Sequence, residues 1–385
     1  MNELDAAPRN LLGRPTTRYR GTNIDGATLA PEGLWVRGRN LNDLIGQTDF
    51  ESALWHIWFE RLPTLAERDA VRARLTAFGR AFEARDASVD AAALVGGMGI
   101  DMVSAAATGF LRGIDGVRAK AGHAPATWES EGDDDFDQML ACIAGAPYLM
   151  RAALGPAIGK LEPATSHAER VLRLCSETDA PPNAGLAIMD ALLIAWHAGF
   201  GYITPTVLVP RCAIGTGVPL AQAIAAGFMS SGPNHVGAAL EAMRWLTALA
   251  ASGGDATTAV DAVIDEPGAL LFGFGHPLFV ADPRPPHLRA LCTSLGFEGP
   301  HLRLFDAACA RARDRKGLNP NIDFITAAAL LDLGVTEPRW GVGVGLCARI
   351  AAMAAHAVER RRRPAFGVNS STARKLLAAV PVGWL

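Results

Sequence analysis

The sequence predicts an all-α protein with a small β element near its start. Ala, Leu, Arg and Glu dominate most of the 385 residues, and apolar side chains recur three and four positions apart, as on one face of a helix. Alternating runs of β-branched residues, which are typical of strands, are scarce. Only residues 22–37 (TNIDGATLAPEGLWVR) combine short apolar runs with turn residues, and there we expect short strands.

Two neighbouring segments show how the helices are delimited. Residues 49–60 (DFESALWHIWFE) carry the apolar spacing of a helix, and Asp49 or Thr48 is placed to cap its N-terminus. A Leu-Pro-Thr sequence at 62–64 ends this helix and starts a second one, over residues 67–86, whose outer face is charged.

Length and composition limit the class of protein. A chain of 385 residues exceeds the commonest domain size, which indicates one large domain plus a smaller one. Half of the residues are hydrophobic and 19% are charged, an ordinary globular balance. The formal net charge of −3 gives no basic excess, so we expect no nucleic-acid partner.

Cysteines and apolar segments indicate the compartment. The six cysteines form no CxxC pair and no zinc-ligand spacing, so we expect reduced thiols and no metal. The first residues lack the apolar core of a signal peptide, and we therefore expect a cytoplasmic protein. The strongest membrane candidate, residues 191–215, is interrupted by aromatic, proline and charged residues within one span length, so we expect no membrane partner.

Two histidines lie in segments that break the helical pattern. A Gly-Pro pair precedes His235 (SGPNHVGAALE) and a helical pattern follows, so we expect the imidazole at a helix N-terminus, where the helix dipole disfavours its protonation. His276 (GFGHPLFVADPR) follows Gly273 and Gly275, and such glycines let the backbone approach a ligand closely.

A carboxylate, Asp323 (NPNIDF), follows a turn fixed by proline. Taken singly, each of these three residues is more often structural than catalytic, because a lone histidine commonly packs in a core and an aspartate after a turn commonly caps a helix. Together they supply one carboxylate and two imidazoles on loops or helix entries. That set suits removal of a proton from a carbon next to a carbonyl while another carbonyl is polarised.

Several segments resemble the citrate synthase family in order and spacing. A single GH or DPR match is not specific to any family. The order shared by several such segments, over roughly residues 30–368, is specific to this one. The matching segments are LWVRGRNLNDL with the later LPT (34–64), AWH (195–197), GPNHVGA (232–238), GFGHP (273–277), DPR (282–284), NPNIDF (319–324) and RIAAMAAHAVERRRR (349–363). The resemblance implies a large helical domain (1–235 and 341–385) and a smaller inserted helical domain (236–340).

The resemblance also implies a role for each of the three residues. Asp323 would be the base that removes an α-proton from the acyl-CoA. His235 would hydrogen-bond the thioester oxygen and stabilise the enol or enolate, and His276 would polarise and protonate the carbonyl of the 2-oxo acid. Neutral imidazole is wanted at His235, in agreement with its expected position at a helix start.

Substrate-binding residues follow from the same resemblance. Arg284 and Arg349 match arginines that hold the carboxylates of oxaloacetate, for which guanidinium forks are suited. Arg363 matches an arginine contributed across the interface of a homodimer, and His197 matches a further substrate-contacting histidine.

The CoA thioester is expected as a substrate and not as a tightly bound cofactor. The backbone at Gly273 and Gly275 is a candidate contact for it, because glycines let the backbone approach a ligand closely. Arg315 or Lys316, just ahead of NPNIDF, would pair with the CoA phosphates. A solvated run of charges explains these two residues equally well. No metal or redox cofactor is implied.

Some positions depart from the housekeeping pattern of the family. The usual A-D-H-E is A-W-H-A here, with Trp196 and Ala198; Val236 replaces a glycine, Pro277 stands where a basic residue is usual, and Ala352 replaces another glycine. The GHP form and the short chain look like the subgroup that contains citryl-CoA lyases and the lyase portion of ATP-citrate lyase. Trp196 and Val236 would reshape the acid pocket toward a substrate other than oxaloacetate.

The expected activity is the making or breaking of a carbon–carbon bond between acetyl-CoA, or a near homologue, and oxaloacetate, or a related 2-oxo acid, through an enol or enolate and a citryl-CoA-like intermediate. One alternative is a strict citryl-CoA lyase that does not hydrolyse the thioester. An alternative of another class is a catalytically silent CoA-metabolite-binding or assembly protein, against which the intact set of two histidines and an aspartate argues. The direction of the reaction and the exact oxo acid stay open.

Overall fold

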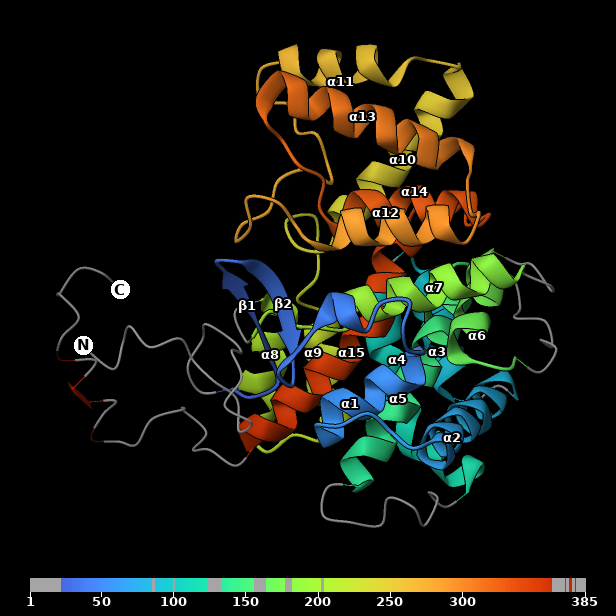
Figure 1. The fold of residues 1–385 in the computed structure, drawn as a ribbon. Coiled ribbons are helices and arrows are strands. Elements are labelled where there is room, and N and C mark those ends of the chain that lie inside the picture. The colour runs from blue at the N-terminus through green and yellow to red at the C-terminus, as the bar shows by residue number, and fades with distance from the viewer. Residues whose placement is uncertain are drawn as a thin grey trace.

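The computed structural model describes residues 22–84, 87–99, 101–122, 133–155, 164–176, 182–201 and 204–361, together with positions 371, 374, 375 and 378. Helices make up most of these residues, which confirms the expected all-α class. Figure 1 shows them in two groups, one above the other.

The small β element is an antiparallel sheet near the start of the chain. Strand β1 (Asp25–Leu29) pairs with β2 (Glu32–Val36), and β2 pairs with β3 (Arg39–Asn40). The first two strands fall within the window predicted from the sequence. The register sets Asp25 opposite Val36, and both side chains are fully buried.

Two helices follow the sheet, and both were predicted from the sequence. Helix α1 (Phe50–Phe59) is capped by Asp49, whose side chain accepts a hydrogen bond from a backbone N–H of the first turn. Helix α2 (Leu65–Glu83) begins with a reciprocal capping box, in which the side chains of Thr64 and Glu67 each bind the other's backbone N–H. The helix starts two residues earlier than predicted because Thr64 is the cap.

The remaining helices divide between the two groups seen in Figure 1. The lower helices comprise α1, α2, α3 (Ala87–Gly97), α4 (Met102–Ala121), α5 (Asp133–Ala153), α6 (His167–Ser176), α7 (Asn183–Trp196), α8 (Pro205–Ile214), α9 (Leu220–Phe228) and α15 (Trp340–Arg361). The upper helices comprise α10 (Ala238–Ser252), α11 (Ala256–Asp265), α12 (Arg284–Ser294), α13 (Pro300–Lys316) and α14 (Ile322–Asp332).

Helix α15 runs through the centre of the lower helices and packs against α5, α7, α8 and α9. By length and composition it is apolar enough to cross a membrane, but 89% of its apolar window is buried inside the protein, as expected of a core helix. The stretch 191–215, which the sequence raised as a membrane candidate, is divided between α7 and α8.

The upper helices all lie within the segment 236–340 that was expected to form the smaller domain. They stand apart from the lower helices in Figure 1 and meet them mainly where α10, α12 and α14 contact α7 and α15. The functional division of the chain into two domains stays a prediction. Because the upper and lower helices meet at this junction, a pocket there is lined by side chains from both groups.

Candidate active site

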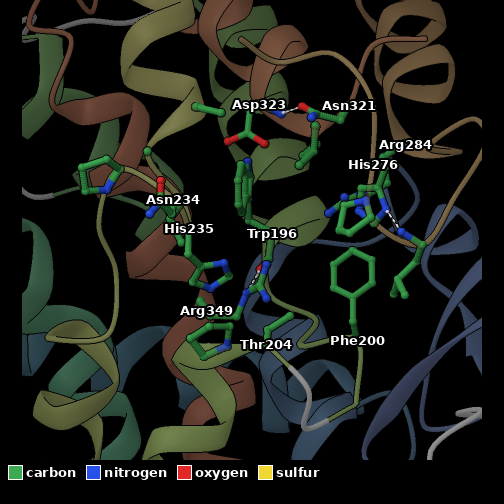
Figure 2. Close-up of a pocket in the computed structure, with 18 residues that line it drawn as sticks. Trp196, Phe200, Thr204, Asn234, His235, His276, Arg284, Asn321, Asp323 and Arg349 are labelled. Carbon is green, nitrogen blue, oxygen red and sulfur yellow. Dashed lines mark hydrogen bonds between the residues drawn. The ribbon is translucent and has the colours of Figure 1, made fainter. Parts of the chain in front are cut away.

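A cavity of about 410 Å³ lies at the junction of the two groups of helices. The end of α7, the loop that follows it and the middle of α15 contribute from below, and the loop before α12 and the start of α14 contribute from above. Five residues that the sequence singled out line this one cavity: His235, His276, Arg284, Asp323 and Arg349. Figure 2 shows Asp323 pointing into the space between the two histidines.

Asp323 occupies the second position of α14. Its backbone N–H donates a hydrogen bond of 2.9 Å to the side chain of Asn321, which caps the helix. Its Oδ1 atom is buried and has no hydrogen-bond partner among the described residues. Burial raises the pKa of this carboxyl from 3.8 to about 6. At neutral pH the group is therefore ionised, poorly solvated and more basic than an ordinary aspartate.

His276 is held in one tautomer by the backbone that follows it. Its Nδ1 atom accepts hydrogen bonds from the N–H groups of Leu278, at 3.1 Å, and Phe279, at 3.2 Å. The ring proton of the neutral imidazole must then reside on Nε2. Burial, with a smaller effect of the Arg284 charge, lowers the pKa of His276 to about 4. The ring is thus a neutral donor beside the cavity.

His235 lies in a tight turn before α10. The backbone groups of Gly232 and His235 exchange two hydrogen bonds of 2.9 Å each, and the Nε2 atom of His235 lies 3.2 Å from the hydroxyl of Thr206. Burial, followed by the charge of Arg349, lowers the pKa of His235 to about 4. The imidazole is neutral, as expected, but burial is the main cause. The helix itself begins three residues later, at Ala238.

The residue after His235 has an unusual backbone. Val236 has φ +72°, in the left-handed region that β-branched residues rarely occupy. Such a conformation costs on the order of 1–3 kcal/mol and persists only where the surroundings enforce it. Gly237 cannot carry a side chain here, because a Cβ atom would lie 2.8 Å from the backbone of Pro233. The strain therefore falls at the position that presents His235 to the cavity.

Arg284 is anchored by a buried carboxylate. Its Nε and Nη2 atoms donate to the two oxygens of Asp282, at 2.9 and 2.7 Å, and Nη1 donates to the carbonyl of Ala195 at 3.3 Å. The bidentate pair fixes the plane of the guanidinium. Arg284 thus faces the cavity in a preset orientation.

Arg349 brings a second positive charge from α15. Its Nε atom donates to the carbonyl of Trp196 at 2.9 Å. Burial, followed by the neighbouring charge of Arg284, lowers its pKa to about 10, so it stays protonated at neutral pH. Two guanidinium groups in one small cavity are suited to a ligand that carries two carboxylates.

A family model described as citrate synthase, C-terminal domain, matches residues 11–366. The chain belongs to the citrate synthase family. It is accordingly an enzyme of the citrate synthase type, as the sequence predicted. The citrate synthase of Haloferax volcanii is 24% identical over 307 residues, which cover 77% of this chain and 78% of the relative.

Solved citrate synthases share the fold. The enzyme from Pyrobaculum aerophilum superposes with a TM-score of 0.71 at 19% identity, covering 90% of this chain and 89% of the other. The enzyme from Thermoplasma acidophilum, solved with carboxymethyl coenzyme A and oxaloacetate, gives 0.71 at 16% identity, with 91% and 92% covered. At these identities the likeness confirms the citrate-synthase fold and no more.

The positions where the chain departs from the usual citrate synthase pattern gather at the cavity. Trp196, Val236 and Pro277 all line it. Ala198, and Ala352 in α15, are buried and do not line the cavity. Three of the five departures expected from the resemblance therefore lie in the lining of the cavity.

Other predicted residues of the citrate synthase site lie outside the lining. His197 is fully buried; its Nδ1 atom lies 2.6 Å from the carbonyl of Ile194, and Nε2 has no partner among the described residues. Gly273 and Gly275 have left-handed φ values of +84° and +74°. A Cβ atom on Gly273 would lie 2.6 Å from Phe324, so this glycine serves close packing. Contacts of these residues with substrate stay predictions.

The basic residues predicted to contact CoA are not part of the cavity lining, and the one predicted to reach the neighbouring subunit is not among the described residues. Arg315 forms ion pairs with Asp261 and Asp265 on α11, and Lys316 ends α13 as an exposed residue. Neither lines the cavity. Arg363 lies outside the described residues. Among those that are described, no group of three or more His, Cys, Asp or Glu could hold a metal ion.

Phe200 is a lining residue that the sequence did not single out. Its ring is stacked on His276, with centroids 5.3 Å apart, and lies beneath the guanidinium groups of Arg284, at 5.0 Å, and Arg349, at 6.0 Å. The residue stands between two glycines in the same Gly-Phe-Gly pattern that precedes His276. That repeated pattern is the signal that could have pointed to it.

Proposed function

We propose that this cavity makes or breaks a carbon–carbon bond between acetyl-CoA, or a near homologue, and oxaloacetate, or a related 2-oxo acid. The observation that supports this most directly is the convergence of a buried carboxylate, two neutral imidazoles and two guanidinium groups on one cavity. The presence of carboxymethyl coenzyme A and oxaloacetate in the solved Thermoplasma acidophilum relative supports the substrate classes.

In the first step Asp323 removes a proton from the acyl methyl group. The electron pair of the broken C–H bond moves toward the thioester oxygen, where negative charge develops. His235, neutral and within the same cavity, donates a hydrogen bond to that oxygen. An aspartate with a pKa of about 6 is better matched to this transfer than an ordinary one, because its conjugate acid is weaker.

In the second step the enolate carbon attacks the carbonyl of the oxo acid. The proton on Nε2 of His276 moves to the carbonyl oxygen as the new bond forms. Arg284 and Arg349 hold the two carboxylates and orient the carbonyl. The backbone N–H groups of Leu278 and Phe279 donate to Nδ1 of His276, which keeps the ring proton on Nε2.

Cleavage follows the same path in reverse. The hydroxyl proton moves to Nε2 of His276, which in this direction must start without its own proton, and protonated Asp323 then gives its proton to the enolate carbon. Hydrolysis of the citryl thioester is a separate reaction that a synthase adds. The three substituted lining positions, Trp196, Val236 and Pro277, support a pocket that differs from that of a housekeeping synthase.

We also propose that the upper helices form a domain that closes on the cavity. They carry His276, Arg284 and Asp323, whereas Trp196, Phe200 and Arg349 belong to the lower group (Figures 1 and 2). Closure would exclude water from the enolate, the role that lids and domain movements generally have in enzymes.

A homodimer in the cytoplasm completes the proposal. Large apolar side chains are exposed on or at the ends of α3, α4, α8 and α9, helices that pack against one another in series. They are Leu94, Met98, Leu111, Leu208 and Met229, exposed by 42–66%. Burying such side chains against a second copy is favourable. In that dimer Arg363 would reach the neighbouring cavity.

The test is to supply citryl-CoA to the purified protein and to separate the products. Acetyl-CoA with oxaloacetate indicates lyase activity, and free citrate with CoA indicates thioester hydrolysis. Only the first result requires cleavage of the carbon–carbon bond, and its loss in His276→Ala ties that chemistry to this cavity. After the second result, condensation of acetyl-CoA with oxaloacetate is measured in the same two proteins. Unchanged citryl-CoA, together with no condensation of acetyl-CoA and oxaloacetate, would refute the proposal.

A further inference from the structure

Behind the cavity lies a buried carboxylate that has no part in the steps above. Asp25, the first residue of β1, is 0% exposed. Its two oxygens accept hydrogen bonds of 2.6 Å from the backbone N–H groups of Gly199 and Gly201. The Nε2 atom of His356 lies 3.0 Å from one of them. A charge buried at this depth is retained only where such partners satisfy it.

The two amides that Asp25 binds flank Phe200. Phe200 has φ +61°, and Gly201 has φ +75°. The left-handed conformation is costly for phenylalanine, on the order of 1–3 kcal/mol. Two charge-assisted hydrogen bonds on either side of the residue are of the strength needed to enforce it. Gly199 adds a close approach, since a Cβ atom there would lie 2.8 Å from Val207.

His356 orients the carboxylate from the opposite side. Its Nδ1 atom lies 3.3 Å from Nη1 of Arg211. A guanidinium group can only donate, so Nδ1 is the acceptor and the proton on Nε2 points to Asp25. His356 follows Arg349 by seven residues, two turns of α15, and so lies on the same side of that helix. One carboxylate thus connects β1, α15 and the segment that carries Phe200.

We propose that Asp25 is a positioning residue for the substrate cavity: it fixes the backbone on both sides of Phe200 and thereby the ring on which His276, Arg284 and Arg349 rest. The inference rests on the proposed function, because those three groups are the proposed contacts of the oxo acid. It assigns a role in substrate binding to a residue that has no contact with the cavity and lies 175 positions before the residue it controls.

The test compares Asp25→Asn with Thr22→Val. The asparagine side chain keeps one oxygen that can accept a hydrogen bond, but its NH2 group faces the second of the two glycine N–H groups. Two donors then face each other, so the segment 199–201 must shift. Thr22 belongs to the same buried network, with its hydroxyl 3.4 Å from Nδ1 of His356, and its hydroxyl also accepts the N–H of Ile24. We expect Asp25→Asn to raise KM for the oxo acid about tenfold with little change in KM for the acyl-CoA. Thr22→Val should leave both values unchanged.

A second readout does not depend on turnover. Phe200 covers one face of His276, so a displaced ring should increase the rate at which diethyl pyrocarbonate modifies His276, measured by mass spectrometry. We expect His276 to be modified severalfold faster in Asp25→Asn than in wild type, and at the wild-type rate in Thr22→Val. If the wild type does not turn over, the proposed function fails, and this rate alone decides whether Asp25 positions Phe200.

A double-mutant cycle completes the design. In a Phe200→Ala background there is no ring to place, so adding Asp25→Asn should change neither KM nor the modification rate further. If Asp25→Asn does not fold by circular dichroism, Gly201→Ala replaces it, because alanine disfavours φ +75° and shifts the same amide. Additive effects, equal effects of Thr22→Val, or wild-type values in a folded Asp25→Asn would overturn the proposal.

Discussion

Asp282 holds Arg284 in a buried bidentate pair and also accepts a hydrogen bond from the first backbone N–H of the helix that carries Asp323. The pair is 2% and 1% exposed, and the Oδ2 atom of Asp282 also accepts the N–H of Ile322 at 3.0 Å. The orientation of a proposed carboxylate-binding group and the start of α14 therefore depend on one side chain. The family resemblance implies a role for the arginine and none for its aspartate.

Asp282→Asn should lower the free energy of unfolding by about 3–5 kcal/mol, because it leaves the guanidinium of Arg284 buried without a charged partner. Urea unfolding at pH 7 measures this. Asp306→Asn serves as the control, since its ion pair with Arg289 is exposed and should be worth about 1 kcal/mol or less. Equal effects of the two substitutions would contradict the role given to the buried pair.

The pH dependence of kcat/KM should report Asp323. Proton removal needs the ionised carboxylate, whose pKa is about 6, while both histidines have pKa values of about 4 and stay neutral above that. We therefore expect kcat/KM to fall about tenfold per pH unit below 6 and to level off above it. A profile that is flat from pH 5 to 7 would contradict the assignment of the base.

The same raised pKa has a consequence for stability. Between pH 3.8 and about 6 the folded protein holds the Asp323 proton more tightly than the unfolded chain does, so stability decreases as pH rises through this window. Asp323→Asn should remove that dependence and make the protein more stable than wild type at pH 7. Thermal unfolding of the two proteins at pH 5 and pH 7 provides the comparison.

Val236→Gly should stabilise the protein by about 1 kcal/mol, because glycine adopts a φ of +72° without the strain that valine has there. Chemical unfolding measures the change. Val103→Gly, in the first turn of α4, is the control and should destabilise, since glycine is a poor helix former. If both substitutions destabilise to the same extent, Val236 is not strained.

Leu111→Glu should weaken the homodimer. Leu111 is 57% exposed on α4, and a charge there would have to be desolvated on association. Sedimentation velocity should show a shift toward monomer, with activity lost in parallel if Arg363 serves the neighbouring cavity. Leu65→Glu, at the start of α2 and 72% exposed, should leave the dimer intact. A wild-type protein that is monomeric and active would refute this part of the account.

Local signals in the sequence predicted what depends on near neighbours. The cap at Asp49, the small sheet and the breaks around His235, His276 and Asp323 all follow from turn and capping residues within a few positions. The family resemblance then placed these segments in a common fold. The five site residues that line the cavity were therefore all predicted from the sequence.

Contacts between distant segments could not be predicted in this way. Asp25 accepts hydrogen bonds from the two glycines on either side of Phe200, which lie 174 and 176 residues away from it in the sequence. Neither Asp25 nor Phe200 stands in a motif that indicates the other. The pairing of Arg315 with acidic residues of α11 depends likewise on packing between two helices. These features arise from the tertiary arrangement, which no local spacing encodes.

The most direct test of the central claim is exchange of the acetyl-CoA methyl protons with deuterated water. L-malate, which has the carboxylates of oxaloacetate but no carbonyl to attack, is added so that the enolate can form and return without condensation. Nuclear magnetic resonance follows wild type, Asp323→Ala and the control Asp314→Ala, an exposed residue of α13. We predict exchange in wild type and control, and a rate about 10²- to 10⁴-fold lower in Asp323→Ala. Exchange at the wild-type rate in a folded Asp323→Ala protein would contradict the assignment of this carboxylate as the base.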